Sequence, residues 1–299
     1  MISLTLAPGM SITEAIANIP NTQPVQVTLE KGEYQEKVWI RRNNVSVIGS
    51  GNRESILSFS DYNDKLHKDG RPFNTFRTPT LTITSDEVTL SNLTIVNDAG
   101  HGKGIGQAVA CALYGDKTRL TQCTILGYQD TLFLGPLPKD LTNRYLDLLP
   151  KELLHQRPLN HLFIDCTIGG SVDYIFGSAT ALFQTCCLIS QLPGYIAAPS
   201  TYEENPIGFV FWNCQILNRS GTNQVFLARP WREHGYVYYH GCRFEGEIHS
   251  VRYDDWGKHK YRFYEDPLIP SPMSRDLSKE RIKQIKQYFE ESFQIILSD

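Results

Sequence analysis

The sequence predicts an all-β solenoid, because one short pattern returns along the chain at intervals that suit the coils of a stack. The pattern is a triplet that begins with Leu or Cys and ends with an apolar residue, as in Cys123-Thr124-Ile125. Its first and third residues share one face of a strand, since side chains alternate along a strand. Successive triplets lie 21 to 43 residues apart, and units of this length bury their apolar faces only by stacking on neighbours. The triplets begin at Leu93, Cys123, Cys166, Cys187, Cys214 and Cys242.

The composition predicts a folded chain and argues against two classes of partner. Of the 299 residues, 41% are hydrophobic and 20% are charged, which is enough to bury a sizeable core. Short runs rich in Val, Ile, Leu and Phe alternate with Gly, Asn and Asp, as expected of strands and turns. The net charge of −3 predicts neither a nucleic-acid partner nor attraction to an anionic membrane. No apolar run approaches the length of a membrane span.

Both ends of the chain carry helical patterns. The segment from Ser11 to Glu14 has the spacing of a capping box and predicts a short helix that closes one end of the solenoid. Near the other end, an apolar stripe at helical spacing predicts an amphipathic helix packed on the outside of the stack. Its members are Ile282, Ile285, Phe289, Phe293 and Ile296. We therefore divide the chain into a β-helix domain over residues 1–270 and a C-terminal helical extension over residues 271–299, packed on the same domain.

The longest interval between triplets is rich in proline and does not suit a regular coil. It contains Pro136, Pro138, Pro150 and Pro158. We therefore expect residues 135–160 to form an inserted loop, since structureless segments this long within a domain are usually functional or disordered. Such an insertion could wall one side of a substrate groove.

The cysteines follow the same repeat. Five of the seven begin a triplet, so we interpret them as a ladder of small buried thiols rather than as disulfides, with Cys111 and Cys186 outside the ladder. No CxxC pair is present, which argues against a zinc site. Seven cysteines without a disulfide framework fit a reducing compartment.

Three short signatures carry groups that can react. They are Gly127-Tyr128-Gln129-Asp130-Thr131-Leu132, Asp173-Tyr174-Ile175-Phe176-Gly177 and Leu227-Ala228-Arg229-Pro230-Trp231. Together they supply two carboxylates, an amide, an arginine and aromatic rings, while no G-x-S-x-G or HExxH motif is present. An ester hydrolase needs a nucleophile, an acid for the departing alkoxide and donors for the oxyanion. An arginine near Asp173 would lower the pKa of that aspartate, while a second, partly desolvated carboxyl close to its charge would have a raised pKa and stay protonated.

Two further signatures, Gly32-Glu33-Tyr34-Gln35-Glu36 and Gln107-Ala108-Val109-Ala110, precede these three. In this order the five resemble the pectin methylesterase (pectinesterase) family from about Leu6 to about Trp256. The resemblance implies a single-stranded right-handed parallel β-helix whose domain is catalytic. It also implies a carbohydrate esterase that hydrolyses the C6 methyl esters of galacturonan without a metal or organic cofactor.

The resemblance implies a role for each of five reacting groups. Asp173 is similar to the nucleophile, which forms an acyl-enzyme anhydride, and Asp130 to the general acid that protonates methanol and then activates water. Gln107 and Gln129 correspond to the oxyanion donors. Arg229 corresponds to the residue that holds Asp173 and keeps it ionised.

The resemblance also implies substrate contacts and reveals departures. Trp231 and Phe176 correspond to rings that stack on sugars, and Thr75 to a threonine that contacts the substrate. The family usually has Phe at Tyr174 and Gly at Ala228. The second departure would strain the backbone only if that position requires a positive φ.

Other functions stay open at this point. An esterase or thioesterase could use the same groups on another substrate, and lyases and glycosidases also use β-helices. A pectin-binding module without activity is a further alternative. As a partner we expect only a methyl-esterified galacturonan or oligogalacturonide, and we expect a monomer. As written the chain has no signal peptide and predicts a cytoplasmic protein acting on imported oligogalacturonides; the alternative is a secreted protein whose leader has been removed.

Overall fold

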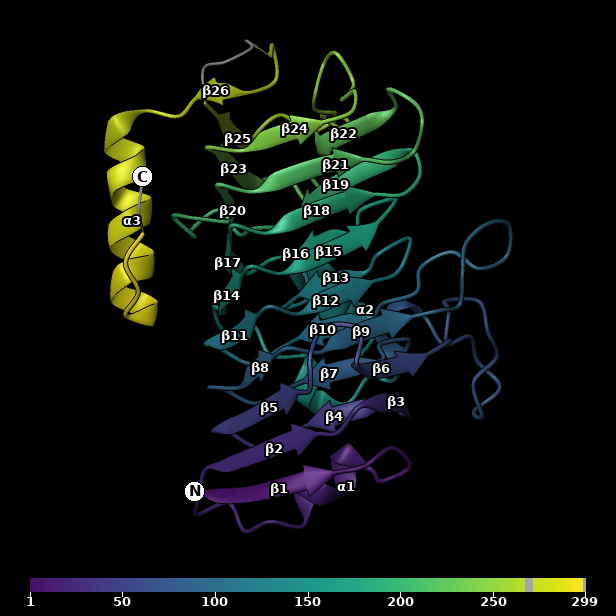
Figure 1. Cartoon of the computed structure of the whole chain (residues 1–299). Helices are drawn as coiled ribbons and strands as arrows, with labels where there is room; N and C mark the ends of the chain where they lie inside the picture. The colour runs from purple at the N-terminus through teal and green to yellow at the C-terminus, as the bar shows by residue number, and fades with distance from the viewer. Residues whose placement is uncertain (267–270, 298–299) are drawn as a thin grey trace.

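A computed structural model describes residues 1–266 and 271–297, and in it the chain winds into a stack of three parallel sheets (Figure 1). The sheet of eleven strands contains β1 (Ile2–Leu6), β2 (Val25–Leu29), β5 (Val45–Gly49), β8 (Thr89–Ser91), β11 (Thr118–Thr121), β14 (Asn160–Ile164), β17 (Thr180–Gln184), β20 (Phe209–Trp212), β23 (Tyr236–His240), β25 (Arg262–Glu265) and β26 (Arg275–Asp276).

The sheet of eight strands contains β3 (Gly32–Gln35), β6 (Ser55–Phe59), β9 (Thr94–Asn97), β12 (Thr124–Leu126), β15 (Thr167–Gly170), β18 (Cys187–Ser190), β21 (Gln215–Asn218) and β24 (Arg243–Glu245). The sheet of seven strands contains β4 (Val38–Ile40), β7 (Leu81–Ile83), β10 (Cys111–Leu113), β13 (Leu132–Leu134), β16 (Ile175–Gly177), β19 (Gly194–Pro199) and β22 (Val225–Ala228). From β8 to β22 each coil gives one strand to each sheet in turn, so each strand pairs with its counterpart one coil before it and, except for the edge strand β22, with the one after it.

The coils turn at a repeated corner between the eleven-stranded and eight-stranded sheets. At each corner one residue has a left-handed backbone conformation, and a buried or half-buried Leu or Cys follows it. These corner residues are Asn92, Gln122, Asp165, Thr185, Asn213 and Gly241, with φ between 51° and 62°. Gly, Asn and Asp adopt this conformation at the lowest cost, which explains why such residues punctuate the strands in the sequence.

The cysteine ladder exists, but one of its predicted members is wrong. The pairing of β15 with β18 sets Thr167 opposite Cys187, so Cys186 is the residue that aligns with Cys166. Cys186 is buried and its thiol donates to the carbonyl oxygen of Phe163 at 3.6 Å, whereas Cys187 is partly exposed. The ladder therefore runs through Cys123, Cys166, Cys186, Cys214 and Cys242, and all seven cysteines of the chain are free. Two adjacent cysteines made both alignments possible in the sequence.

The helix α1 (Ile12–Ala17) lies at the N-terminal end of the stack (Figure 1). Ser11 caps it by accepting a hydrogen bond from the Glu14 amide at 3.1 Å. The Glu36 carboxylate also accepts from the amides of Ile12 and Thr13, at 2.8 and 3.1 Å. A carboxylate at a helix N-terminus is stabilising. The signature that ends at Glu36 is thus part of the scaffold.

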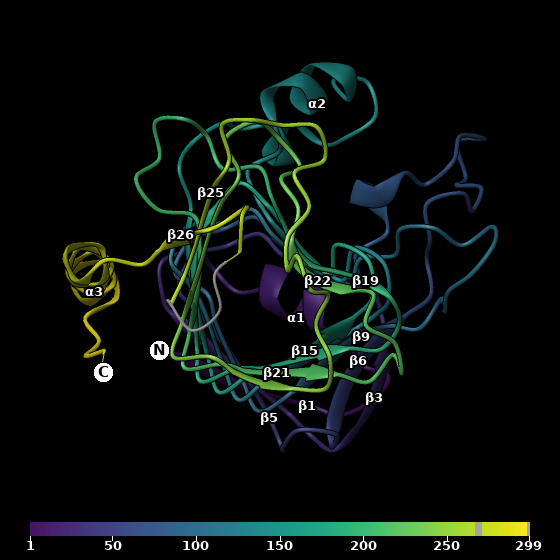
Figure 2. The same cartoon turned by 90° about the horizontal axis from the view of Figure 1, so that it is seen from above.

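The helix α3 (Lys279–Phe293) packs on the outer side of the eleven-stranded sheet (Figure 2). Ile285, Phe289 and Phe293 are buried there. Ile296 lies beyond the end of the helix and is 88% exposed, so its predicted place in the apolar stripe is wrong. The neighbouring Leu297 is buried instead.

Residues 135–160 are more ordered than the predicted loop. They contain the helix α2 (Lys139–Arg144) and the 3-10 helix η2 (Lys151–Leu153). Four leucines anchor this insertion on the outer face of the seven-stranded sheet, where they pack against Tyr114 and Phe133; they are Leu137, Leu141, Leu149 and Leu153. In the view along the stack, α2 projects on a different side from α3 (Figure 2).

Candidate active site

A pocket of about 480 Å³ contains all eight site residues that the sequence singled out. It lies against the seven-stranded sheet and is lined by Thr75, Phe76, Gln107, Gln129, Asp130, Leu141, Arg144, Tyr145, Asp173, Phe176, Ala198, Arg229, Trp231, Arg232 and Trp256. These residues are up to 181 positions apart in the sequence, and only the stacking of coils brings them together.

The two aspartates occupy equivalent positions on adjacent coils. β13 and β16 pair with Leu132 opposite Ile175, and two residues earlier the Asp130 amide donates to the carbonyl oxygen of Val172 at 3.0 Å. The same register therefore places Asp130 beside Asp173, about 4.8 Å away between backbones, the spacing of neighbouring strands. Both have a left-handed backbone, with φ of 62° and 52°. Such conformations are costly and tend to occur at functional sites.

Asp173 forms a bidentate ion pair with Arg229. The Nε and Nη2 atoms of Arg229 donate to Oδ1 and Oδ2 of Asp173 at 2.9 and 2.7 Å. The guanidinium also lies over the rings of Tyr195 and Trp256, at 4.0 and 3.9 Å from their centroids. Planar stacking and the forked donors fix arginine more tightly than a lysine could be fixed. The carboxylate of Asp173 is thereby held in one orientation.

Burial displaces the pKa of both aspartates upward, but not equally. Asp173 is 8% exposed, and desolvation raises its pKa although Arg229 opposes this. Arg229 lowers the pKa of Asp173, as predicted, but the sequence did not reveal the desolvation, which outweighs the ion pair and makes the net shift upward. Desolvation raises the pKa of Asp130 well above its ordinary value, and the neighbouring charge of Asp173 adds to this effect. Asp130 is thus the carboxyl that keeps its proton to higher pH.

The amides of Gln107 and Gln129 are available to a ligand. Neither side chain hydrogen-bonds to another residue among those that the structure describes, although both line the pocket. The backbone around them is fixed, since the Ala108 amide donates to the carbonyl oxygen of Gln129 at 3.1 Å. Two free amide donors therefore reach the space beside the paired carboxyl groups, as an oxyanion requires.

The three predicted contacts with sugars do not share one role. Trp231 is partly exposed at the pocket, and Thr75 enters it from the 3-10 helix η1 (Thr75–Arg77). Phe176 is only 2% exposed and packs against Trp231, with ring centroids 5.7 Å apart. We therefore assign Phe176 to the support of Trp231, in place of the predicted stacking on a sugar. Gly177 follows it because a Cβ there would lie 2.1 Å from the carbonyl oxygen of Leu134.

Several residues that line the pocket, and Tyr195 behind it, escaped the sequence reasoning. Tyr195 and Trp256 support Arg229, while Arg144 and Tyr145 come from the insertion. Only Tyr195 carried a usable signal, since the register of β16 and β19 places it next to Asp173. Ala228 is absent from the residues with positive φ, so its departure from Gly strains nothing.

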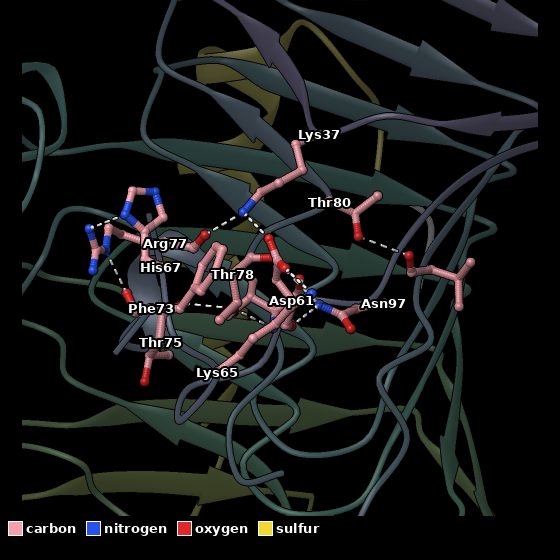
Figure 3. Close-up of polar contacts among 12 residues, drawn as sticks. Lys37, Asp61, Lys65, His67, Phe73, Thr75, Arg77, Thr78, Thr80 and Asn97 are labelled. Carbon is pink, nitrogen blue, oxygen red and sulfur yellow. Dashed lines mark hydrogen bonds and ion pairs between the residues drawn. The ribbon is translucent and has the colours of Figure 1, made fainter. Parts of the chain in front are cut away.

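A charge cluster around the buried Asp61 holds the segment that carries Thr75 (Figure 3). Asp61, whose side chain is 2% exposed, accepts from Lys37 at 2.6 Å and from Lys65 at 2.8 Å. Lys37 also donates to the carbonyl oxygen of Arg77 at 2.5 Å. Burial lowers the pKa of Lys37, and the hydrogen bond to Asp61 opposes that effect. The cluster thus joins Asp61 and Arg77, on either side of Thr75, to the residue that precedes β4.

Within residues 1–266 and 271–297, no three His, Cys, Asp or Glu side chains are grouped so that they could hold a metal ion. No helix of this part of the chain is long and apolar enough to cross a membrane.

A family model described as Pectinesterase matches residues 7–136 and 152–264, which is well over half of the chain. The chain belongs to the pectinesterase family. It is 32% identical over 269 residues to pectinesterase QRT1 of Arabidopsis thaliana, a match that covers 85% of this chain. The same match covers 63% of the relative, so this pectinesterase-family chain spans less than two thirds of that protein's length.

Solved structures agree with the fold of this family member. Pectin methylesterase PemA from Erwinia chrysanthemi is 22% identical with a TM-score of 0.78, over 100% of this chain and 98% of its own. A pectin methylesterase in complex with a hexasaccharide is also 22% identical with a TM-score of 0.78, covering 99% and 98%. These likenesses confirm the predicted parallel β-helix.

Proposed function

We propose that the protein is a pectin methylesterase that hydrolyses C6 methyl esters of galacturonan or oligogalacturonides to free carboxylate and methanol. The observation that carries the proposal is the arrangement of Asp130 and Asp173 on adjacent coils, in one pocket with two free amides. Membership of the pectinesterase family supports the reaction class. The hexasaccharide complex of a structural neighbour supports an oligosaccharide as ligand.

In the first half of the reaction, one oxygen of Asp173 attacks the ester carbonyl carbon. The carbonyl oxygen becomes an oxyanion that accepts hydrogen bonds from Gln107 and Gln129, and such donors are typically worth about 3–4 kcal/mol in the transition state. The bond to the methoxy oxygen then breaks while Asp130 gives its proton to that oxygen. Methanol leaves, and Asp173 and the sugar acid remain joined as an anhydride.

In the second half, Asp130 is a carboxylate and takes a proton from water as the water attacks the C6 carbonyl carbon of the sugar in the anhydride. The bond from that carbon to the Asp173 oxygen breaks, which returns Asp173 as a carboxylate and releases galacturonic acid, and this acid gives its remaining proton to solvent. Asp130 is protonated again at the end. The raised pKa of Asp130 suits this sequence, because a general acid must hold its proton at the working pH.

The test is methanol release from methylated trigalacturonate and from long methylated pectin, with Asp173→Asn alongside. We expect release by the natural protein and at least a 1,000-fold lower rate in the variant, whose melting temperature is measured to verify folding. No methanol from either substrate would refute the assignment and favour an esterase or thioesterase acting on another substrate. Equal rates would refute the role of Asp173.

The chain length of the preferred substrate bears on location. We propose a cytoplasmic enzyme that meets imported methylated oligogalacturonides, with the seven free thiols as support because such thiols suit a reducing compartment. Cell fractionation tests this directly. Recovery of the mature chain outside the cell, together with a preference for long pectin, would refute it.

A further inference from the structure

Arg144 brings a positive charge into the pocket from the insertion. It is the last residue of α2, its side chain is exposed, and it lines the same pocket as Asp130 and Asp173. The matched residues of the family model, 7–136 and 152–264, leave out the part of the insertion that contains it. Arg144 therefore lies outside the part of the chain that the family model matches.

The other two arginines of the pocket already have partners. Arg229 is paired with Asp173 through two hydrogen bonds. Arg232 is paired with Asp140 in the same way, with Nε and Nη2 at 3.0 and 2.7 Å from the two carboxylate oxygens. Asp140 lies one helical turn before Arg144, but Arg232 occupies both of its oxygens.

Arg144 itself has no such partner. Within the part of the chain that the structure describes, it makes no side-chain hydrogen bond and no ion pair within 4 Å. Of the arginines that line the pocket, it is thus the one whose five donors remain open to a ligand.

The helix that carries Arg144 is firmly placed. Leu141 is 5% exposed within the apolar cluster over the seven-stranded sheet, and the ring of Tyr145 packs on Phe76 with centroids 5.9 Å apart. The ion pair of Asp140 with Arg232 joins the other side of α2 to the segment after Arg229. Arg144 therefore projects from a base that is fixed on two sides.

We propose that Arg144 forms a carboxylate-binding subsite for the free C6 carboxylate of a galacturonate next to the one being de-esterified. The proposal rests on the proposed esterase function. A planar guanidinium matches a carboxylate through two parallel hydrogen bonds, whereas a methyl ester lacks both the charge and one acceptor. Each turnover creates the group that this subsite binds, so the enzyme favours substrates that already carry free carboxylates.

The experiment compares two hexagalacturonates, one fully methylated and one with about half of its carboxyl groups free. Arg144→Gln lowers kcat/KM on the half-free substrate by about tenfold, mainly through KM, and leaves the fully methylated substrate within about twofold. Arg144→Lys retains part of the preference, because it keeps the charge but not the fork. The loss shrinks at high salt.

Lys139→Gln is the matched control. It removes one positive charge from the same helix, but Lys139 is 68% exposed, pairs with Glu204 and does not line the pocket. We expect it to leave both substrates unchanged. An equal loss on both substrates in Arg144→Gln, or no loss on either, would overturn the subsite.

Failure of the esterase proposal is distinguishable from failure of the subsite. If the natural protein releases no methanol, titration calorimetry with fully de-esterified hexagalacturonate measures the subsite alone. Binding that Arg144→Gln weakens and Lys139→Gln does not would support the subsite. No binding by the natural protein would overturn it.

Discussion

Replacing Arg229 with glutamine removes the guanidinium that holds Asp173 and keeps an amide of similar reach. The pair is well shielded, since the two side chains are only 17% and 12% exposed. Asp173 would lose the cation that favours its ionised form, while the desolvation that disfavours this form would remain. The nucleophile would then be protonated over more of the pH range.

The size of the effect follows from the geometry of the pair. Charges in a bidentate pair lie roughly 4 Å apart, and their attraction at an effective dielectric of about 20 is about 4 kcal/mol. An energy of about 4 kcal/mol corresponds to a pKa increase of about three units for Asp173 in the variant. At a fixed pH below that new pKa, the fraction of Asp173 that is ionised falls by a factor of up to about 1,000. We therefore expect kcat/KM to fall by roughly 100–1,000-fold at acidic to neutral pH.

The assay is the pH dependence of methanol release. Activity requires ionised Asp173, so it rises with pH through that pKa, and Arg229→Gln moves this ascending limb to higher pH. Arg232→Gln is the control, because it removes a similarly paired arginine from the same pocket without touching Asp173. If the limb of Arg229→Gln stays in place, or if Arg232→Gln moves it equally, the reasoning is refuted.

Three further predictions concern the stability of the folded chain. The pKa of Asp130 is raised in the folded state, so the folded chain loses stability as pH rises from the ordinary value of 3.8 through that raised pKa. Asp130→Asn should abolish methanol release, yet its unfolding free energy should rise by about 1–3 kcal/mol at pH 8 and by almost nothing at pH 4. Thermal melts of the variant and the natural protein at both pH values test this. A lower melting temperature of the variant at pH 8 would contradict it. Asp61→Asn leaves the half-buried Lys37 without its counter-charge and should cost about 1–3 kcal/mol in urea unfolding, together with a raised KM. An unchanged midpoint would exclude the anchoring role. Cys186→Ala should cost about 1 kcal/mol, whereas Cys187→Ala should cost almost nothing, and the reverse order in thermal melts would restore the alignment first expected from the sequence.

The sequence predicted those features that depend on repetition and on ordered signatures. The triplets revealed the stack, and the signatures contain seven of the eight predicted site residues that the structure finds in one pocket, with Thr75 as the eighth. Register could not be read where two alignments were equally apolar, as at Cys186 and Cys187. The path of the insertion also escaped prediction, because its leucines bury themselves through contacts with distant rings such as Tyr114 and not through a local period.

Burial was the other quantity that the sequence did not reveal. Phe176 resembles an exposed stacking ring in its signature, but the coil before it and Trp231 cover it. The pKa of Asp173 depends on the balance between desolvation and a cation 56 residues away, and only the packed structure decides that balance. Trp256 supports Arg229 from a segment without any recognisable pattern.

Asp130 and Asp173 lie on neighbouring coils, so the distance between them is set by the hydrogen bonds between paired strands. The length of chain that connects them does not affect it. The insertion lengthens that link, yet the hydrogen bonds from Asp130 to Val172 and from Leu132 to Tyr174 keep the rungs aligned. Extra residues between coils can therefore reshape the rim of the pocket while the chemistry beneath is unaltered. A slip of a single residue within β13 would be far more damaging, because it would turn every side chain of that rung to the opposite face.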